Sequence, residues 1–94
     1  MYESKLKSAE LDRLFAAILT LKNTEECYML FEDLCTISEL KSMSQRFKVA
    51  QLLKEGHTCH EISAQTGAST ATISRVNRCL VYGTGGYKTT LERL

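Results

Sequence analysis

The chain has 94 residues, a formal net charge of +1 and 44% hydrophobic residues. This length fits one domain with a small core, and this hydrophobic content excludes an intrinsically disordered chain. No apolar run approaches the roughly 20 residues of a membrane helix, and the charged N-terminal segment is not a signal peptide, so we expect a cytoplasmic protein that does not enter a membrane.

The first two predicted helices are amphipathic. Residues 4–22 place leucine, isoleucine and phenylalanine at helical spacing. Thr24 is expected to cap a second helix, which has two glutamates in its first turn and an apolar stripe that runs from Cys27 to Cys35.

The third predicted helix is the longest. Thr36 and Glu39 are spaced as a capping box, and the helix is expected to run from about residue 37 to residue 55 and to end at Gly56. Together, the first three helices carry more apolar surface than a monomer of this size needs to cover a helical hairpin. We therefore infer that they form an interface between two copies of the chain.

Residues 56–82 predict a helix-turn-helix. Thr58 and Glu61 are spaced as a capping box at the start of a short helix over residues 59–66. Gly67 is expected to end this helix, because glycine enters the left-handed conformation at little steric cost.

The second helix of this unit is expected to run from residue 70 to about residue 81, with Ser69 as its N-cap. The residues that helical spacing turns towards the core of the unit are Ile62, Ile73, Val76, Asn77 and Leu80. Small, hydroxylated and basic residues lie on the opposite side, where they could approach a groove of DNA: Ala71, Ser74, Arg75 and Arg78.

The glycine-rich segment 83–86 is expected to break the helix, and residues 87–94 predict a last short helix with Leu91 and Leu94 turned inward. The expected fold class is all-α, with five to six helices. The chain is expected to form one domain with three parts: a helical dimerisation half over residues 1–55, the helix-turn-helix over 56–82 and a tail over 83–94.

The small net charge conceals an uneven distribution. Residues 1–40 carry four basic and eight acidic side chains, whereas residues 41–94 carry eight basic and three acidic ones. This asymmetry indicates an acidic scaffold half and a basic half that meets a polyanion.

The cysteines and histidines do not predict a metal site. The four cysteines include no C-x-x-C pair, and His57, Cys59 and His60 lie close together without a fourth ligand, so we expect no metal and no cofactor. The sequence also lacks a catalytic triad pattern and a phosphate-binding loop that joins a strand to a helix, so we do not expect an enzyme.

Three phrases of the sequence resemble the Trp repressor family, and most closely its branch of YerC/YecD proteins from bacteria. The phrases are Leu52-Leu53-Lys54 with Gly56, Gly67-Ala68 in the turn, and Ala71-Thr72-Ile73-Ser74-Arg75 in the second helix. The resemblance covers roughly residues 10–82. It implies an intertwined homodimer whose two helix-turn-helix heads enter successive major grooves of double-stranded DNA at a pseudo-palindromic operator.

The resemblance also implies which side chains approach DNA. Thr70, Ala71 and Ser74 match positions that face bases, His60 and Ser63 match positions in the first helix, and Lys54 and Thr58 match positions near phosphate. The full set of expected DNA-binding residues is Lys54, Thr58, His60, Ser63, Ser69, Thr70, Ala71, Thr72, Ser74, Arg75 and Arg78.

The family's corepressor pocket is altered in this sequence. Arg46 and Arg75 match the two arginines that hold the ligand, but Val76 stands where the tryptophan-binding protein has glycine, and Cys79 replaces a serine. A β-branched side chain fills the space that an indole requires, so we expect no tryptophan binding. The sequence leaves open whether another small molecule acts as a corepressor.

The expected function is that of a sequence-specific DNA-binding transcriptional regulator, and in particular a repressor that is associated with the nucleoid when bound. The alternative is a helical protein-interaction module without sequence-specific DNA binding, whose acidic half binds a basic partner.

Overall fold

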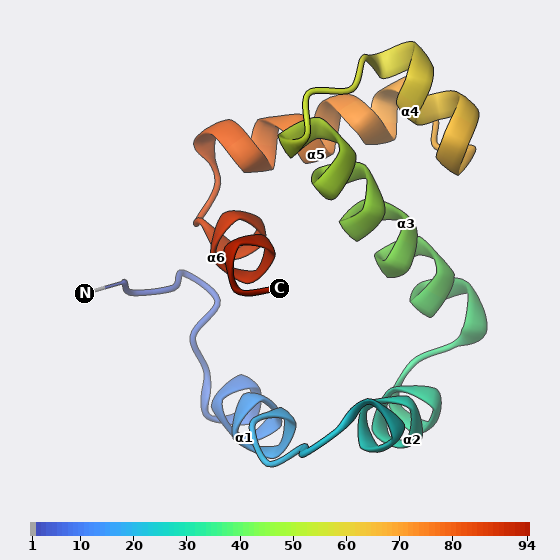
Figure 1. Ribbon diagram of the computed structural model, residues 1–94. Coiled ribbons are helices and arrows are strands. Elements are labelled where there is room, and N and C mark those ends of the chain that lie inside the picture. The colour runs from blue at the N-terminus through green and yellow to red at the C-terminus, as the bar shows by residue number, and fades with distance from the viewer. Residues whose placement is uncertain (1) are drawn as a thin grey trace. The chain divides into compact units, whose positions relative to one another are not determined.

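The computed structural model describes residues 2–94, and this part of the chain forms six α-helices and no β-strand (Figure 1). The chain divides into two compact units, one ending at Thr36 and the other spanning residues 37–94. No helix among residues 2–94 is long and apolar enough to cross a membrane. The prediction of an all-α chain is confirmed. The helices are α1 (Ala9–Ile18), α2 (Thr24–Leu34), α3 (Ile37–Lys54), α4 (Cys59–Thr66), α5 (Thr70–Tyr82) and α6 (Gly86–Arg93).

Helix α1 is shorter at both ends than the predicted helix over residues 4–22. Ser8 has an extended backbone, and its Oγ accepts the N–H of Leu11 at 3.1 Å, so that the helix begins only after this residue. At the other end, the N–H of Thr20 bonds to the carbonyl three residues back at 3.1 Å, a tighter turn than an α-helix makes. A capping serine inside an amphipathic segment thus sets the start of α1, which periodicity alone placed too early.

The N-cap of α2 is Asn23, and the prediction that Thr24 caps this helix is wrong. Asn23 Oδ1 accepts the N–H of Glu26 at 2.9 Å, and the carboxylate of Glu26 accepts the N–H of Lys22 at 3.0 Å. Asparagine is at least as good an N-cap as threonine, and this choice places Glu26 where it can bond back to the preceding backbone.

The first unit has no buried side chain in either of its helices. Cys27, which was expected to pack within the apolar stripe of α2, is exposed, whereas Cys35 is half-buried. The large apolar side chains that this unit leaves exposed to solvent are Tyr2, Leu6, Phe15, Leu19, Tyr28, Met29 and Leu34. Neither α1 nor α2 therefore buries its apolar face within the first unit.

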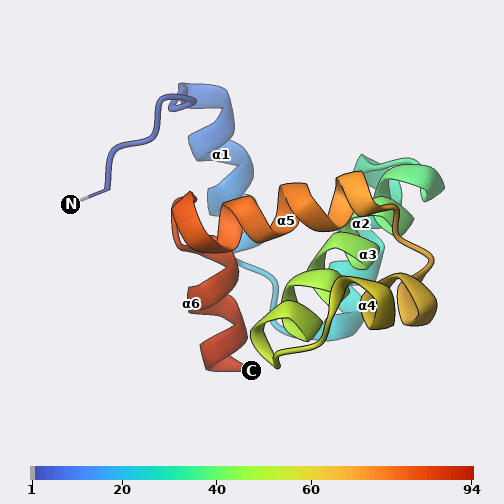
Figure 2. The ribbon, with the colours of Figure 1, turned by 90° about the horizontal axis from the view of Figure 1, so that it is seen from above.

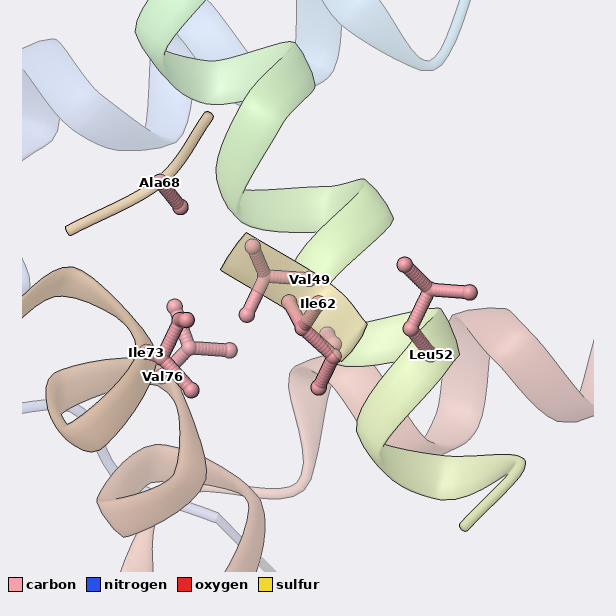
Figure 3. Close-up of a cluster of buried hydrophobic side chains, with 7 residues drawn as sticks. Val49, Leu52, Ile62, Ala68, Ile73 and Val76 are labelled. Atoms are coloured by element: carbon pink, nitrogen blue, oxygen red, sulfur yellow. The ribbon is translucent and has the colours of Figure 1, made fainter. Parts of the chain in front are cut away.

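The second unit contains the core of the chain (Figure 3). The helices α3, α4 and α5 pack against one another, and α6 packs against α3 and α5 (Figure 2). The buried side chains are Val49, Ala50 and Leu52 of α3, Ile62 of α4, Ala68 of the turn, and Ile73 and Val76 of α5.

Two side chains that were expected to face this core do not. Asn77 is exposed, because Ile73 and Val76 fill the inner face of α5 and leave Asn77 at its polar edge. Leu94 is 89% exposed, since α6 ends one residue before it, whereas Leu91 packs against the core as predicted.

Candidate nucleic-acid interface

The first helix of the helix-turn-helix, α4, has the predicted cap. The N–H of Thr58 donates to Glu61 Oε1 at 2.8 Å, and the N–H of Glu61 donates to Thr58 Oγ1 at 3.2 Å. The helix ends at Gly67, whose φ of 72° is the left-handed conformation that glycine adopts without strain. Both ends of α4 are therefore fixed by local chemistry, as the sequence indicated.

The turn between the two helices is closed by several hydrogen bonds. The N–H of Gly67 donates to the Ser63 carbonyl at 2.9 Å, and the N–H of Ala68 donates to Thr66 Oγ1 at 3.1 Å. From α3, the Gln45 side-chain amide donates to the Thr66 carbonyl at 3.2 Å. Ser63, one of the expected DNA-binding residues, is half-buried.

The second helix, α5, begins after Ser69, as predicted. Ser69 Oγ accepts the N–H of Thr72 at 3.1 Å, and the Ser69 hydroxyl donates to Thr72 Oγ1, also at 3.1 Å. Both residues belong to the expected DNA-binding set. Their hydroxyl groups hold the first turn of α5, next to the exposed Thr70.

The outer face of α5 is exposed, as helical spacing predicted. The side chains on this face are Ala71, Ser74, Arg75 and Arg78. Arg75 and Arg78 also line an open groove of about 290 Å³ at the C-terminal end of the helix, together with Cys79, Tyr82 and Gly83.

Sequence reasoning missed Tyr82, which continues the stripe of Arg75 and Arg78 at positions i, i+3 and i+7. Its side chain is 84% exposed. The signal was present, because extending the helical period by one more turn places an aromatic ring on the same face as the two guanidinium groups.

The remaining predicted contacts lie on α3 and α4. His60 is exposed in the first turn of α4, whereas Thr58 is already engaged in the cap. Lys54, at the end of α3, has its ammonium nitrogen 3.8 Å from Glu92 Oε1 of α6. The fold thus brings an acidic side chain to a position that was expected to meet phosphate, and the separation of these two residues in sequence gave no sign of it.

The hydrogen bonds and charges around the start of α4 favour the ionised form of Glu61. The hydrogen bond from the Thr58 backbone is the main cause that lowers the pKa of Glu61, followed by the bond to the Thr58 side chain and by the nearby His57 and His60. The ring nitrogens of His57 lie 3.6 Å from a Glu55 oxygen and 3.9 Å from a Glu61 oxygen. A protonated His57 would therefore stand between two carboxylates.

The predicted ligand-pocket residues occupy different surroundings. Val76 is 1% exposed and belongs to the core. Cys79 lines a second groove, of about 520 Å³, in which the rings of Phe47 and Tyr87 are 6.1 Å apart. Arg46 lines neither of the grooves that contain Arg75 and Cys79. Whether these four residues hold a ligand stays a prediction.

Among residues 2–94, no cluster of three or more histidine, cysteine, aspartate or glutamate side chains could hold an ion. His57, Cys59 and His60 are neighbours at the start of α4, and Cys59 is a free, exposed thiol.

Comparison with known proteins shows similarity over nearly the whole chain. The sequence model of the Trp repressor protein family matches residues 9–94. The uncharacterised protein YerC of Bacillus subtilis is 56% identical over 94 residues, which are 100% of this chain and 90% of that protein. These matches include the N-terminal helices as well as the helix-turn-helix.

Two crystal structures share the fold. A protein from Staphylococcus aureus that is provisionally named a Trp repressor is 55% identical to this chain, with a TM-score of 0.91. The structural match covers 95% of this chain and 89% of that one. A TrpR-like protein from Eubacterium eligens is 56% identical to this chain, with a TM-score of 0.91. The structural match covers 95% of this chain and 92% of that one.

Proposed function

The chain belongs to the Trp repressor family of DNA-binding regulators, and on this premise we propose that it is a homodimeric repressor that reads a pseudo-palindromic operator. The exposed outer face of α5 supports this proposal. A recognition helix contacts bases through the residues near its N-terminus, and here these residues are small or carry hydroxyl groups. Ala71 allows close approach to a base edge, and Ser74 offers a donor and an acceptor.

The two arginines of α5 supply the charge of this face. Arg75 and Arg78 lie one turn apart, each with a guanidinium group that can bond to a guanine edge or to phosphate oxygens in bidentate fashion. Because their side chains are exposed, they reach DNA without any change in the packing of the core. Thr70 extends the same surface at the helix start.

Phosphate anchoring is proposed to come from side chains around α4. His60 and Lys54 carry donors at or near the start of α4, where the positive end of the helix dipole also favours an anion. The hydroxyl oxygens of Thr58 and Ser69 accept backbone N–H groups as helix caps. Their proposed contribution is therefore to hold the starts of α4 and α5 in place.

A homodimer is supported by the first unit. Its helices leave Phe15, Leu19 and Met29 exposed, and a second copy of the same surface would cover them. Two heads related by a two-fold axis would then meet half-sites about 34–36 Å apart on one face of the DNA. The operator is therefore expected to be a pseudo-palindrome.

We further propose that tryptophan is not the corepressor. The core position of Val76 supports this, because its two methyl groups occupy the inner face of α5. DNA binding is accordingly expected without added tryptophan.

The test is selection of operators from random double-stranded DNA, followed by fluorescence anisotropy with a selected and a scrambled duplex. We expect the selected duplex to bind about a thousandfold more tightly. Arg75→Ala and Arg78→Ala should each reduce that ratio, whereas Lys88→Ala on α6 should leave it unchanged. Equal affinity for both duplexes, with no response to either arginine substitution, would overturn the proposal.

The alternative function is a protein-interaction module, which the exposed apolar side chains of α1 and α2 also favour. The dependence of DNA affinity on salt concentration distinguishes the two functions. A protein that contacts several phosphates loses affinity about a thousandfold or more between about 50 and 200 mM salt. A chain without salt-dependent DNA binding would support the interaction module.

A further inference from the structure

One side chain of the long helix α3 reaches the turn of the helix-turn-helix. The amide nitrogen of Gln45 donates to the carbonyl oxygen of Thr66 at 3.2 Å, and the two residues are 21 positions apart in sequence. Thr66 is the last residue of α4, so its carbonyl has no partner within that helix. Gln45 therefore satisfies a helix end that the backbone leaves open.

Thr66 also organises the turn that follows. Its hydroxyl donates to the Ile62 carbonyl at 2.7 Å, and it accepts the N–H of Ala68 at 3.1 Å. Ala68 is buried in the core, one residue before the cap of α5. A continuous series of hydrogen bonds thus runs from α3 through the end of α4 to the residue that leads into α5.

A small apolar core also joins α3 to the helix-turn-helix. Apolar burial is non-directional, and it constrains rotation of one helix over another less than a hydrogen bond does. The bond from Gln45 fixes both a distance and a direction between α3 and the turn. The bond is therefore suited to set the angle between α5 and α3.

From this geometry we propose that Gln45 is a positioning residue, which fastens the helix-turn-helix to α3 and holds α5 in the orientation that reads DNA. Gln45 does not touch DNA itself in this proposal. The consequence for DNA rests on the proposed function, whereas the orientation of α5 does not depend on it.

The experiment compares three variants of the full chain. Gln45→Met keeps the length of the side chain and removes the donor. Gln51→Met removes a half-buried glutamine of the same helix, whose side chain donates to Glu55 at 3.1 Å. Ile62→Val weakens the core by one methylene group and leaves every hydrogen bond in place, so it serves as a control for lost stability.

Two measurements follow the position of α5 directly. Residual dipolar couplings of the backbone amides report the orientation of α5 relative to α3, and hydrogen exchange reports the protection of the Ala68 amide. In Gln45→Met we expect altered couplings for α4 and α5 and roughly tenfold faster exchange at Ala68, because the half-buried Thr66 carbonyl has lost its donor. Both controls should keep the couplings of the unaltered chain.

A third measurement is the ratio of affinities for a selected and a scrambled duplex. It should fall about tenfold in Gln45→Met and stay unchanged in Ile62→Val and Gln51→Met. Unchanged couplings and exchange in Gln45→Met would overturn the proposal, as would an equal fall in the ratio for Ile62→Val. If the unaltered chain does not discriminate between the duplexes, the DNA-binding function fails, and the couplings alone then decide the role of Gln45.

Discussion

Thr58 and Glu61 are joined by two reciprocal hydrogen bonds, of 2.8 Å from the Thr58 N–H to the Glu61 carboxylate and of 3.2 Å from the Glu61 N–H to the Thr58 hydroxyl. The first of these bonds is the main reason that the pKa of Glu61 lies below its ordinary value of 4.5. The start of α4 is therefore coupled to the protonation of one exposed carboxyl group.

The stability of the protein should consequently depend on pH through Glu61. Because the folded state lowers the pKa of this group, its carboxylate stabilises the fold at pH values above 4.5, and that contribution is lost as the pH falls through the folded value. Urea unfolding should show that Glu61→Gln is less stable than the unaltered chain near neutral pH. The difference should close on acidification and should be smaller in a Thr58→Ala background. A difference that does not change with pH would contradict this assignment.

The caps at Ser8 and Ser69 allow stability and DNA binding to be separated. In each case the serine Oγ accepts the N–H three residues further on, at 3.1 Å. Replacement of either serine by alanine should cost about 1 kcal/mol in the free energy of unfolding. Only Ser69→Ala should also weaken binding to a selected duplex, because it loosens the first turn of α5. If Ser8→Ala weakened DNA binding equally, the effect of Ser69→Ala would reflect stability alone.

Local motifs explain how much of the helix-turn-helix could be predicted from the sequence. The capping box at Thr58, the left-handed Gly67 and the N-cap at Ser69 each depend on residues within three or four positions. Local chemistry also corrects the prediction where it competes with periodicity. Ser8 and Asn23 begin their helices at positions that the apolar pattern does not mark.

Contacts between distant residues could not be predicted in this way. The bond from the Gln45 side chain to the Thr66 carbonyl and the ion pair between Lys54 and Glu92 each join two different helices. No spacing rule relates such residues, because the contacts arise only when α3 packs against α4 and α6. Tyr82 differs from these, since one more turn of the α5 stripe would have identified it.

Removal of the ion pair between Lys54 and Glu92 is expected to strengthen DNA binding. The two charged atoms are 3.8 Å apart and both side chains are partly exposed, so the pair itself contributes little stability. If Lys54 meets phosphate, the carboxylate of Glu92 opposes that contact. Glu92→Gln should therefore raise DNA affinity about twofold at low salt, and the gain should disappear at high salt. Anisotropy titrations in a Lys54→Ala background provide the control, in which Glu92→Gln should have no effect.

The buried position of Val76 predicts the response to tryptophan. Isothermal titration calorimetry should detect no tryptophan binding in the micromolar range, and added tryptophan should not change the affinity for a selected duplex. Val76→Ala should lower the free energy of unfolding by about 1–3 kcal/mol, because the side chain is 1% exposed and its removal leaves a cavity. Micromolar binding of tryptophan to the unaltered chain would show that this position does not close the pocket.

The exposed apolar face of the first unit predicts the oligomeric state. Leu19 at the end of α1 is 85% exposed, and Tyr2, outside any helix, is 68% exposed. Sedimentation velocity should return a dimer at micromolar concentration, and Leu19→Asp should dissociate it because the interface would then bury an unpaired carboxylate. Tyr2→Asp adds the same charge outside the helices and should leave the dimer intact. Since both heads are needed for a pseudo-palindromic operator, Leu19→Asp should also abolish discrimination between selected and scrambled duplexes. A monomer for the unaltered chain, with full discrimination retained, would contradict the dimeric arrangement.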